Sequence, residues 1–239
     1  MRVGILSPPR RSEGQRMLEA CLLQAGHSVA EPVYSQDMDV TVCWGTSSTF
    51  GLNSKPAVTG CEQLAALADA ALGAPYKLPE FTADPTVAAE WVRGGGLVFG
   101  RQNNHTQGRD IVGPTQRAFY DRDYWVKMIP AIAEEWRIHS FAGKSIARGK
   151  KIYEGEDVQP PIVRSRRRGW RMAHDITPPN GLRPAAKAAV AALGYDFGAV
   201  DLVRTADGSV YVLEVNKQPG LDGYTAAQYV SAIERYVRD

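Results

Sequence analysis

The sequence has few cysteines, little net charge and no long apolar run. Its 239 residues include three cysteines, Cys21, Cys43 and Cys61, and no CxxC pair. So sparse and odd a set predicts small apolar side chains in a reducing compartment. The longest apolar stretch, 185–193, is interrupted by Lys187 and falls short of the about 18 residues that a membrane helix needs. The N-terminal run 3–6 is too short for a signal-peptide core. We therefore expect a cytoplasmic protein that does not enter a membrane.

The charge balance excludes a strongly basic protein. Lys and Arg number 28 and Asp and Glu number 26, which leaves a formal net charge of +2. A dedicated nucleic-acid-binding domain is usually clearly basic, so a nucleic-acid partner is not expected and any basic function must be local. The hydrophobic fraction of 44% is ordinary for a globular protein. The length suffices for one large domain or two to three small lobes.

Hydrophobic periodicity predicts strands alternating with helices in the first half and strand pairs in the second. Expected strands are 2–6, 40–44, 97–100, 135–141, 145–152, 198–204 and 209–216. Expected helices are 12–26, 61–72, 86–93, 182–194 and 225–238. This order indicates mixed α/β or α+β lobes.

The segment 198–216 carries the most informative pattern. With Asp207 and Gly208 as a two-residue turn, Asp201 is predicted to face Glu214, with β-carbons roughly 4.5–5.5 Å apart. Asn216 shares the face of Glu214 because side chains alternate along a strand. Apolar neighbours keep water from relieving the repulsion, and the oxygen-only set suits Mg²⁺ shared with nucleotide phosphates. The alternative is an exposed hairpin with scattered charges.

These residues also carry a family resemblance. The segment 195–221 reads YDFGAVDLVRTADGSVYVLEVNKQPGL and resembles the C-terminal signature of the ATP-grasp superfamily. In that signature Asp201, Glu214 and Asn216 take the positions of the magnesium ligands, where Mn²⁺ is the alternative ion. EEWRIHSFAGK (134–144) and VRSRRRGW (163–170) resemble a short branch found in tailed-phage genomes and near RimK-like ligases. The resemblance extends over roughly 97–221 and is weak before 97.

The resemblance implies an α/β protein with the ATP-grasp fold. A short N-terminal α/β lobe (1–75) would precede two α+β lobes that sandwich ATP. The central lobe (76–130) would carry a phosphate flap, and the C-terminal lobe (131–239) would carry the metal site.

The same resemblance assigns residues to ATP. They are Arg101, Gly108, Lys127, Ile129, Glu135, Arg137 and His139. Arg101 and the flap at 103–111 would meet the phosphates. Lys127 and Ile129 would line the adenine pocket, and Glu135 would take the ribose hydroxyls. Glu135, Arg137 and His139 alternate onto one strand face, for which a solvated face of an antiparallel sheet is the alternative.

A hairpin turn at Gly143 and Lys144 would place Arg137 opposite Lys150. Two facing cations favour an anion between them, and a triphosphate is the obvious one. A bulge at Gly149 would shift the register by one residue, so Lys150 and Lys151 stay alternatives.

Residues 164–171 hold five arginines in eight positions. The run could be a nucleic-acid patch, a solvated basic face or an active-site wall, since Arg binds phosphate and carboxylate in a bidentate way. The resemblance favours the wall for Arg164, on a strand entering the interior, and the solvated face for 166–168. Ala199 stands where many amino-acid ligases of the superfamily carry an Arg, so Arg164 or Arg171 is the preferred transition-state residue. Lys217 could bind a substrate carboxylate.

The implied activity is ATP- and Mg²⁺-dependent joining of a carboxylate to an amine through an acyl-phosphate, with release of ADP and phosphate. The expected partners are small-molecule or peptide substrates, and the sequence allows a homodimer. Two alternatives remain: a kinase that uses the same fold, and a nucleotide- or nucleic-acid-binding module without turnover.

Overall fold

The computed structural model describes residues 1–103, 111–115 and 121–239. The predicted helices and strands are present, with ends that shift by a few residues, and the structure adds short strands that the sequence did not indicate. No helix within these described ranges is long and apolar enough to cross a bilayer.

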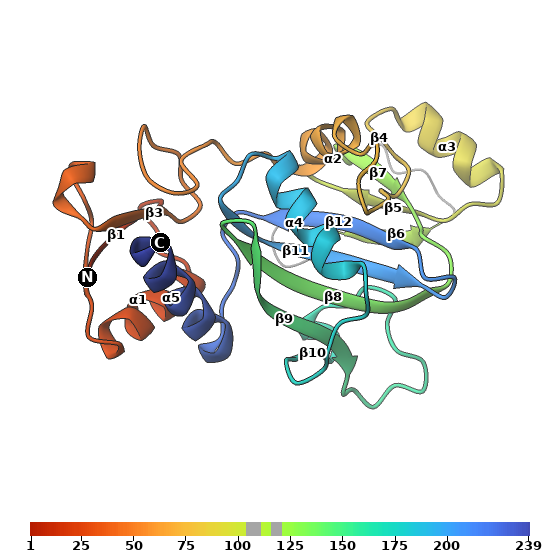
Figure 1. Ribbon diagram of the computed structural model, residues 1–239. Helices are drawn as coiled ribbons and strands as arrows, with labels where there is room; N and C mark the ends of the chain where they lie inside the picture. Colours follow the sequence, from red (N-terminus) through yellow and green to blue (C-terminus); the bar gives the residue numbers. More distant parts are fainter. Residues whose placement is uncertain (104–110, 116–120) are drawn as a thin grey trace.

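The N-terminal sheet has three short parallel strands. Their order is β2 (Ser28–Ala30), β1 (Arg2–Leu6) and β3 (Val40–Cys43). Helix α1 (Glu13–Gln24) begins at Ser12, whose hydroxyl accepts a hydrogen bond from the amide of Gln15 and so caps the helix. Helix α5 (Gly223–Arg238), at the other end of the chain, packs beside α1 (Figure 1). Its Tyr229 shares one core cluster with Val3, so the last helix completes the N-terminal core.

The central sheet lies between two helices. Its strand order is β4 (Phe81–Thr82), β7 (Tyr124–Lys127), β5 (Val98–Arg101) and β6 (Val112–Thr115). Trp125 packs on one face with Ala88 of α3 (Pro85–Arg93). Tyr124 and Val126 pack on the other face with Leu64 of α2 (Gly60–Asp69).

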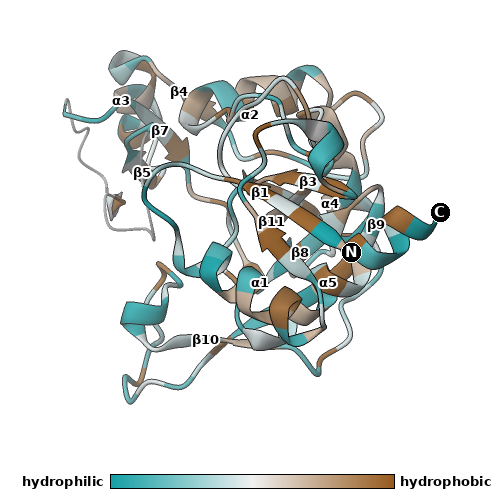
Figure 2. Cartoon of the chain, turned by 90° about the vertical axis from the view of Figure 1, so that its left-hand side faces the viewer, coloured by the Kyte–Doolittle hydropathy of each residue, from teal (hydrophilic) through white to brown (hydrophobic). Residues whose placement is uncertain are grey.

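The C-terminal sheet is antiparallel and carries the polar face expected from the sequence. Its order is β10 (Trp170–Ala173), β9 (Lys144–Tyr153), β8 (Ile132–Phe141), β11 (Phe197–Thr205) and β12 (Val210–Asn216). Helix α4 (Leu182–Ala192) covers one face, where Trp136 and Leu202 are fully buried. Hydrophobic residues gather on strand β11 of this sheet and on strand β3 of the N-terminal sheet (Figure 2). The opposite face of this sheet carries Arg137 and Asp201, which lie side by side.

The predicted lobe boundaries, at 75/76 and 130/131, stay predictions. Side-chain packing crosses both of them. Leu67 of α2 lies in the core cluster of α4 and the C-terminal sheet, although α2 precedes residue 75. Helix α5 follows residue 131 but packs in the N-terminal core.

The pairing of Asp201 with Glu214 is confirmed, although the turn differs from the prediction. Near the turn Arg204 pairs with Val210, so the loop is one residue longer than a two-residue turn. A bulge at Leu213 then adds one residue to β12 and restores the predicted register at Asp201.

The predicted turn between β8 and β9 is wrong by one residue. Ala142 and Gly143, with φ of 45° and 70°, form the turn, so Phe141 pairs with Lys144. A bulge at Ile146, rather than at Gly149 as the sequence allowed, then shifts the register by one residue, so Arg137 faces Gly149 and not Lys150. Since neighbours on a strand point to opposite faces, Lys150 lies on the α4 face, opposite Trp136, and Lys151 lies on the polar face.

Candidate active site

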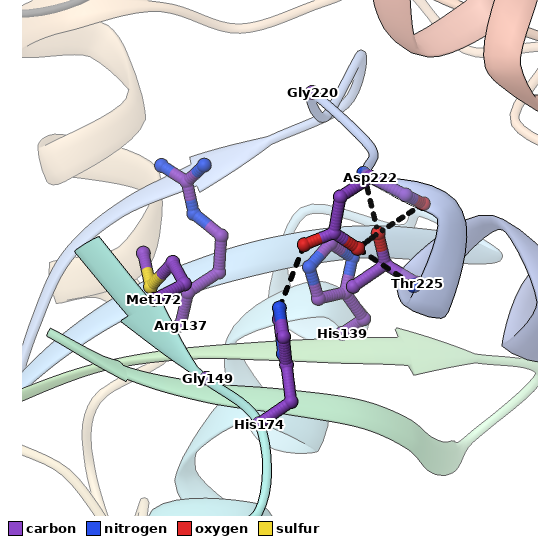
Figure 3. Close-up of a pocket in the computed structure, with 8 residues that line it drawn as sticks. All are labelled: Arg137, His139, Gly149, Met172, His174, Gly220, Asp222 and Thr225. Carbon is purple, nitrogen blue, oxygen red and sulfur yellow. Dashed lines mark hydrogen bonds and ion pairs between the residues drawn. The ribbon is translucent and has the colours of Figure 1, made fainter. Parts of the chain in front are cut away.

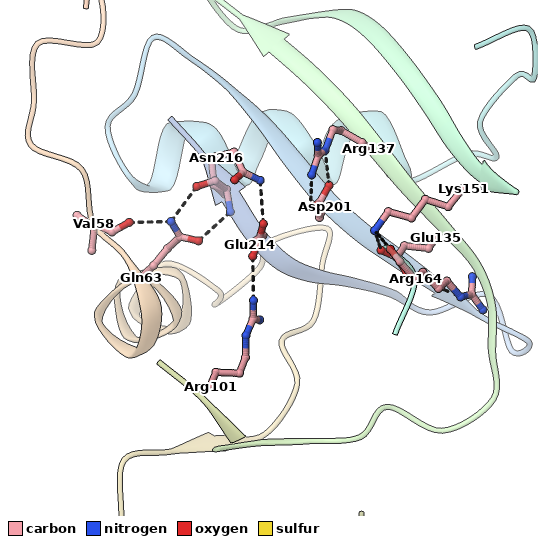
Figure 4. Close-up of polar contacts among 11 residues, drawn as sticks. Val58, Gln63, Arg101, Glu135, Arg137, Lys151, Arg164, Asp201, Glu214 and Asn216 are labelled. Carbon is pink, nitrogen blue, oxygen red and sulfur yellow. Dashed lines mark hydrogen bonds and ion pairs between the residues drawn. The ribbon is translucent and has the colours of Figure 1, made fainter. Parts of the chain in front are cut away.

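A partly buried ion pair lies on the polar face of the C-terminal sheet. Arg137 donates from Nε to Asp201 Oδ1 at 2.6 Å and from Nη2 to Oδ2 at 2.7 Å. Burial opposes ionisation of Asp201, but the guanidinium of Arg137 more than offsets it and holds the pKa of Asp201 at about 2. Asp201 is therefore a carboxylate at neutral pH, and it faces Glu214 on its other side (Figure 4).

Glu214 joins the two sheets. Its Oε2 accepts a hydrogen bond from Arg101 Nη2 at 3.0 Å, and Arg101 ends strand β5 of the central sheet. Its Oε1 accepts from the amide nitrogen of Asn216 at 3.0 Å. The resulting charge row runs Arg137, Asp201, Glu214 and Arg101, with a guanidinium at each end and two carboxylates between (Figure 4).

The donor set fits a magnesium ion that shares its ligands with a nucleotide. Asp201, Glu214 and Asn216 offer only oxygen to a hard cation. Among the residues that the structure describes, no three His, Cys, Asp or Glu side chains gather as a metal cluster. Two carboxylates and an amide would therefore need further oxygens, which is the pattern for Mg²⁺ bound with substrate phosphates.

A second cluster surrounds Glu135. Lys151 donates to the Glu135 carboxylate and, at 2.8 Å, to the carbonyl oxygen of Arg164. The Arg164 guanidinium lies 3.8 Å from Glu135 Oε2 and 4.8 Å from the ring centroid of Trp170. Burial raises the pKa of Glu135, and the two cations oppose that rise. Lys151 and Arg164 thus lie together on the polar face.

Lys150 and Arg171 lie elsewhere. Lys150 donates to Glu134 at 2.7 Å on the α4 face. Arg171 pairs with Ile152 in the β9–β10 ladder, on the face away from Lys151, and it is exposed beside Glu154. The structure therefore favours Lys151 over Lys150 and Arg164 over Arg171 as site residues.

The arginine run adopts the predicted turn but not the predicted strand. Residues 166–168 form an exposed 3₁₀ turn that ends at Gly169 in the left-handed region. The expectation of a strand entering the interior at 160–164 is wrong, because this segment forms no strand and Ile162 is exposed. Its prolines, Pro160 and Pro161, lack the backbone N–H groups that a ladder requires.

The residues assigned to adenine lie at the end of β7. The Lys127 ammonium donates to Glu80 at 2.8 Å and lies 5.8 Å from the ring centroid of Trp91, on the α3 side of the central sheet. Its backbone N–H donates to the carbonyl oxygen of Glu80 at 2.8 Å, and binding of adenine at Lys127 stays a prediction. Ile129 is buried. Gly108 of the expected flap lies outside the described residues.

His139 is buried beside a small cavity. Its Nδ1 lies 3.3 Å from the hydroxyl of Tyr229, and burial, followed by the charge of Arg137, lowers the pKa of His139 to about 3. The cavity holds about 50 Å³ and is lined also by His174 and Asp222 (Figure 3). Asp222 caps α5 and contacts His174 Nε2 at 2.7 Å. This space is too small for a nucleotide.

A larger cavity of about 350 Å³ is lined by residues that belong to, or adjoin, strands of all three sheets. It is lined by the end of β12, the start of α2, Arg101 and Tyr124. Lys217 also lines it, but the buried ammonium donates to the carbonyl oxygens of Thr46 and Lys55, and burial lowers its pKa. Binding of a substrate carboxylate by Lys217 stays a prediction.

Sequence reasoning missed Gln63 and Tyr124. Gln63 is buried on the face of α2 that carries Leu64 and Leu67, and it bonds to β12. A polar residue on an apolar helix face was the available signal. Tyr124 lines the larger cavity, 5.9 Å from the Arg101 guanidinium to its ring centroid.

Known structures define the fold. No protein-family profile and no curated protein matches the sequence. The ATP-grasp ligase PsnB, complexed with a minimal precursor, Mg and ADP, matches with a TM-score of 0.69 at 13% identity, over 98% of this chain and 97% of that one. The macrocyclase MdnC from Microcystis aeruginosa MRC, bound with precursor peptide MdnA, matches with a TM-score of 0.65 at 12% identity over all of both chains. D-alanine–D-alanine ligase from Bacillus anthracis, complexed with ATP, gives 0.62 at 15% identity over 100% and 97%.

The chain therefore has the ATP-grasp fold, as its sequence predicted. These structures do not test the resemblance to the phage-type, RimK-like branch, which stays a prediction.

Proposed function

We propose that this chain is an ATP- and Mg²⁺-dependent ligase that joins a carboxylate to an amine through an acyl-phosphate and releases ADP and phosphate. The observation that carries the proposal is the charge row at the junction of the two sheets. The buried carboxylate of Asp201 and the partly exposed carboxylate of Glu214 face each other there, and each has a guanidinium beside it. In an ATP-grasp fold this junction is where a nucleotide's phosphates would be held.

Asp201, Glu214 and Asn216 would hold the magnesium ion, which when bound supplies positive charge to the β- and γ-phosphates. Arg137 keeps Asp201 ionised and oriented through both of its oxygens. Arg101 would leave Glu214 for a phosphate when the nucleotide binds. Its position at the end of β5 lets it reach across from the central sheet.

A substrate carboxylate oxygen would attack the γ-phosphorus, and ADP would leave with the electrons of the broken P–O bond. The amine would then attack the acyl carbon, phosphate would leave with the electrons of the broken C–O bond, and the proton lost from the amine would pass to the departing phosphate as the amide forms. Arg164 and Lys151 would offset the charge that develops on the transferring group, a type of contact that typically contributes about 3–4 kcal/mol. Neither step needs a covalent enzyme intermediate.

The volume of the larger cavity indicates the size of the substrate group that could bind there. Its volume of about 350 Å³ lies at the lower end of ligand-binding cavities, which suits one amino-acid-sized group. PsnB and MdnC are complexed with precursor peptides. We propose that the carboxylate and amine belong to a peptide or to small molecules of amino-acid size.

The test is amine-stimulated release of ADP and phosphate across a panel of amino acids and peptides. Glu214→Gln should abolish release. Glu234→Gln is the control: it alters a carboxylate of α5 that pairs with His27, and it should leave release unchanged. ADP with a phosphorylated product and no free phosphate would identify a kinase instead. Absence of turnover together with steeply salt-dependent nucleic-acid binding would favour a binding module.

A further inference from the structure

The side chain of Gln63 pairs with the main chain of the strand that carries two of the three magnesium candidates. Its Oε1 accepts a hydrogen bond from the amide of Val215 at 2.7 Å, and its Nε2 donates to the Val215 carbonyl at 2.9 Å. The same nitrogen donates to the carbonyl of Val58 at 2.8 Å (Figure 4). Gln63 is 6% exposed, so these bonds are shielded from water.

Val215 lies between Glu214 and Asn216. Its N–H belongs to the peptide plane shared with Glu214, and its carbonyl belongs to the plane shared with Asn216. Gln63 therefore fixes both peptide planes between the two residues. The orientation of those planes decides where the side chains of Glu214 and Asn216 point.

Strand β12 needs such a partner because it is the last strand of its sheet. The edge of a sheet leaves backbone donors and acceptors without a neighbouring strand. Near the start of β12 the backbone of Lys77 bonds to Val210 and Val212. At its functional end the amide of Gln63 takes the place of a neighbouring residue, with one donor and one acceptor.

We propose that Gln63 is a positioning residue for the magnesium–nucleotide site, a role that rests on the proposed function. It orients Glu214 and Asn216 through Val215, and it links them to Val58 in the wall of the larger cavity. The role requires a glutamine, because the site uses one acceptor and two donations from a single amide. Methionine has similar length without hydrogen bonds, and glutamate keeps only the acceptor.

The experiment measures Mn²⁺ binding by electron paramagnetic resonance in the presence of saturating ADP. Gln63→Met and Gln63→Glu should each weaken Mn²⁺ binding by about 10-fold or more, the usual effect of losing a residue that orients metal ligands. ADP affinity in EDTA should stay unchanged. The matched control is Gln15→Met, which alters a buried glutamine of α1 that bonds to Glu19 and should leave Mn²⁺ affinity at the wild-type value.

A lowered melting temperature with wild-type Mn²⁺ affinity would overturn the proposal, because Gln63 would then only stabilise the fold. Should Gln63→Met not fold, Gln63→Glu decides alone, since it retains the bond from the Val215 amide. If the wild-type protein binds Mn²⁺ and ADP but ligates no substrate, the proposed ligase activity is wrong, whereas the proposed role of Gln63 is unaffected. Wild-type protein that binds no Mn²⁺ with ADP would overturn both.

Discussion

Replacement of Arg101 by methionine should have opposite effects on metal and nucleotide. Arg101 and Glu214 form a contact of 3.0 Å between the central and C-terminal sheets. In the proposed cycle the guanidinium competes with a cation for Glu214 when no nucleotide is bound, and it binds a phosphate when one is. Arg101→Met keeps an apolar stem beside Tyr124 and removes only the charge and its donors.

The magnitudes follow from the exposure of the pair. The Arg101 and Glu214 side chains are 14% and 26% exposed, so water screens their attraction in part. Such a pair typically contributes about 1 kcal/mol at most, which corresponds to about fivefold tighter Mn²⁺ binding to the nucleotide-free variant. A hydrogen bond to a charged group contributes about 1.5–3 kcal/mol, so ATP should bind roughly 10- to 100-fold more weakly.

The assay is a pair of titrations on folded protein, Mn²⁺ by electron paramagnetic resonance without nucleotide and ATP by calorimetry with Mg²⁺. Arg11→Met is the matched control, since it breaks an ion pair of the same 3.0 Å length in the N-terminal lobe. Weaker Mn²⁺ binding in Arg101→Met would refute the competition, and unchanged ATP binding would refute the phosphate contact.

Three further predictions concern turnover and pH. Arg164→Ala should lower the rate of ADP release by roughly 10²- to 10³-fold with little change in melting temperature. Replacement of all three residues at 166–168 by alanine should change that rate only slightly when the substrate is small. The reverse result in steady-state assays would identify the exposed turn as a docking site. Glu214→Gln should retain the wild-type circular dichroism spectrum and lose turnover, and near-normal ATP consumption would contradict the metal assignment. Burial and Arg137 lower the pKa of His139 from 6.5 to about 3, so the unfolded chain takes up a proton that the folded chain does not, and stability should fall as pH drops from 6.5 towards 3. His139→Gln should flatten that part of the melting-temperature profile, and an unaltered slope would contradict the assignment.

The facing carboxylates could be predicted because strand alternation and a nearby turn are local properties. The turn at Asp207 was nevertheless one residue longer than its sequence indicates, and only the bulge at Leu213 restores the pairing of Asp201 with Glu214. Bulges of this kind leave no clear signal in one sequence. The prediction was right at the site and wrong at the turn.

In the hairpin between β8 and β9 a shifted turn is also followed by a bulge, at Ile146, but here the bulge does not restore the predicted pairing. Its turn places Ala142 at a positive φ, a backbone conformation that residues other than glycine rarely adopt. The bulge at Ile146 shifts the register by one residue and so exchanges the faces of Lys150 and Lys151, which is why the cation opposite Glu135 could not be chosen from the sequence. The partner of Gln63 could not be predicted for another reason: Val215 lies 152 residues away, and a periodic pattern contains no such pairing.

Strand β12 explains why contacts between distant segments decide this site. Glu214 bonds to Arg101 of the central sheet, Val215 bonds to Gln63 of α2, and Lys217 donates to carbonyls of the N-terminal lobe. Nearly every residue from 214 to 217 is therefore held by a different part of the chain. Of these contacts, the one through Arg101 is a charged side-chain pair that a phosphate can replace, whereas those at Val215 and Lys217 involve backbone groups. Nucleotide binding would thus release the central sheet from β12 while the metal-binding end of the strand stays fixed by its other two contacts.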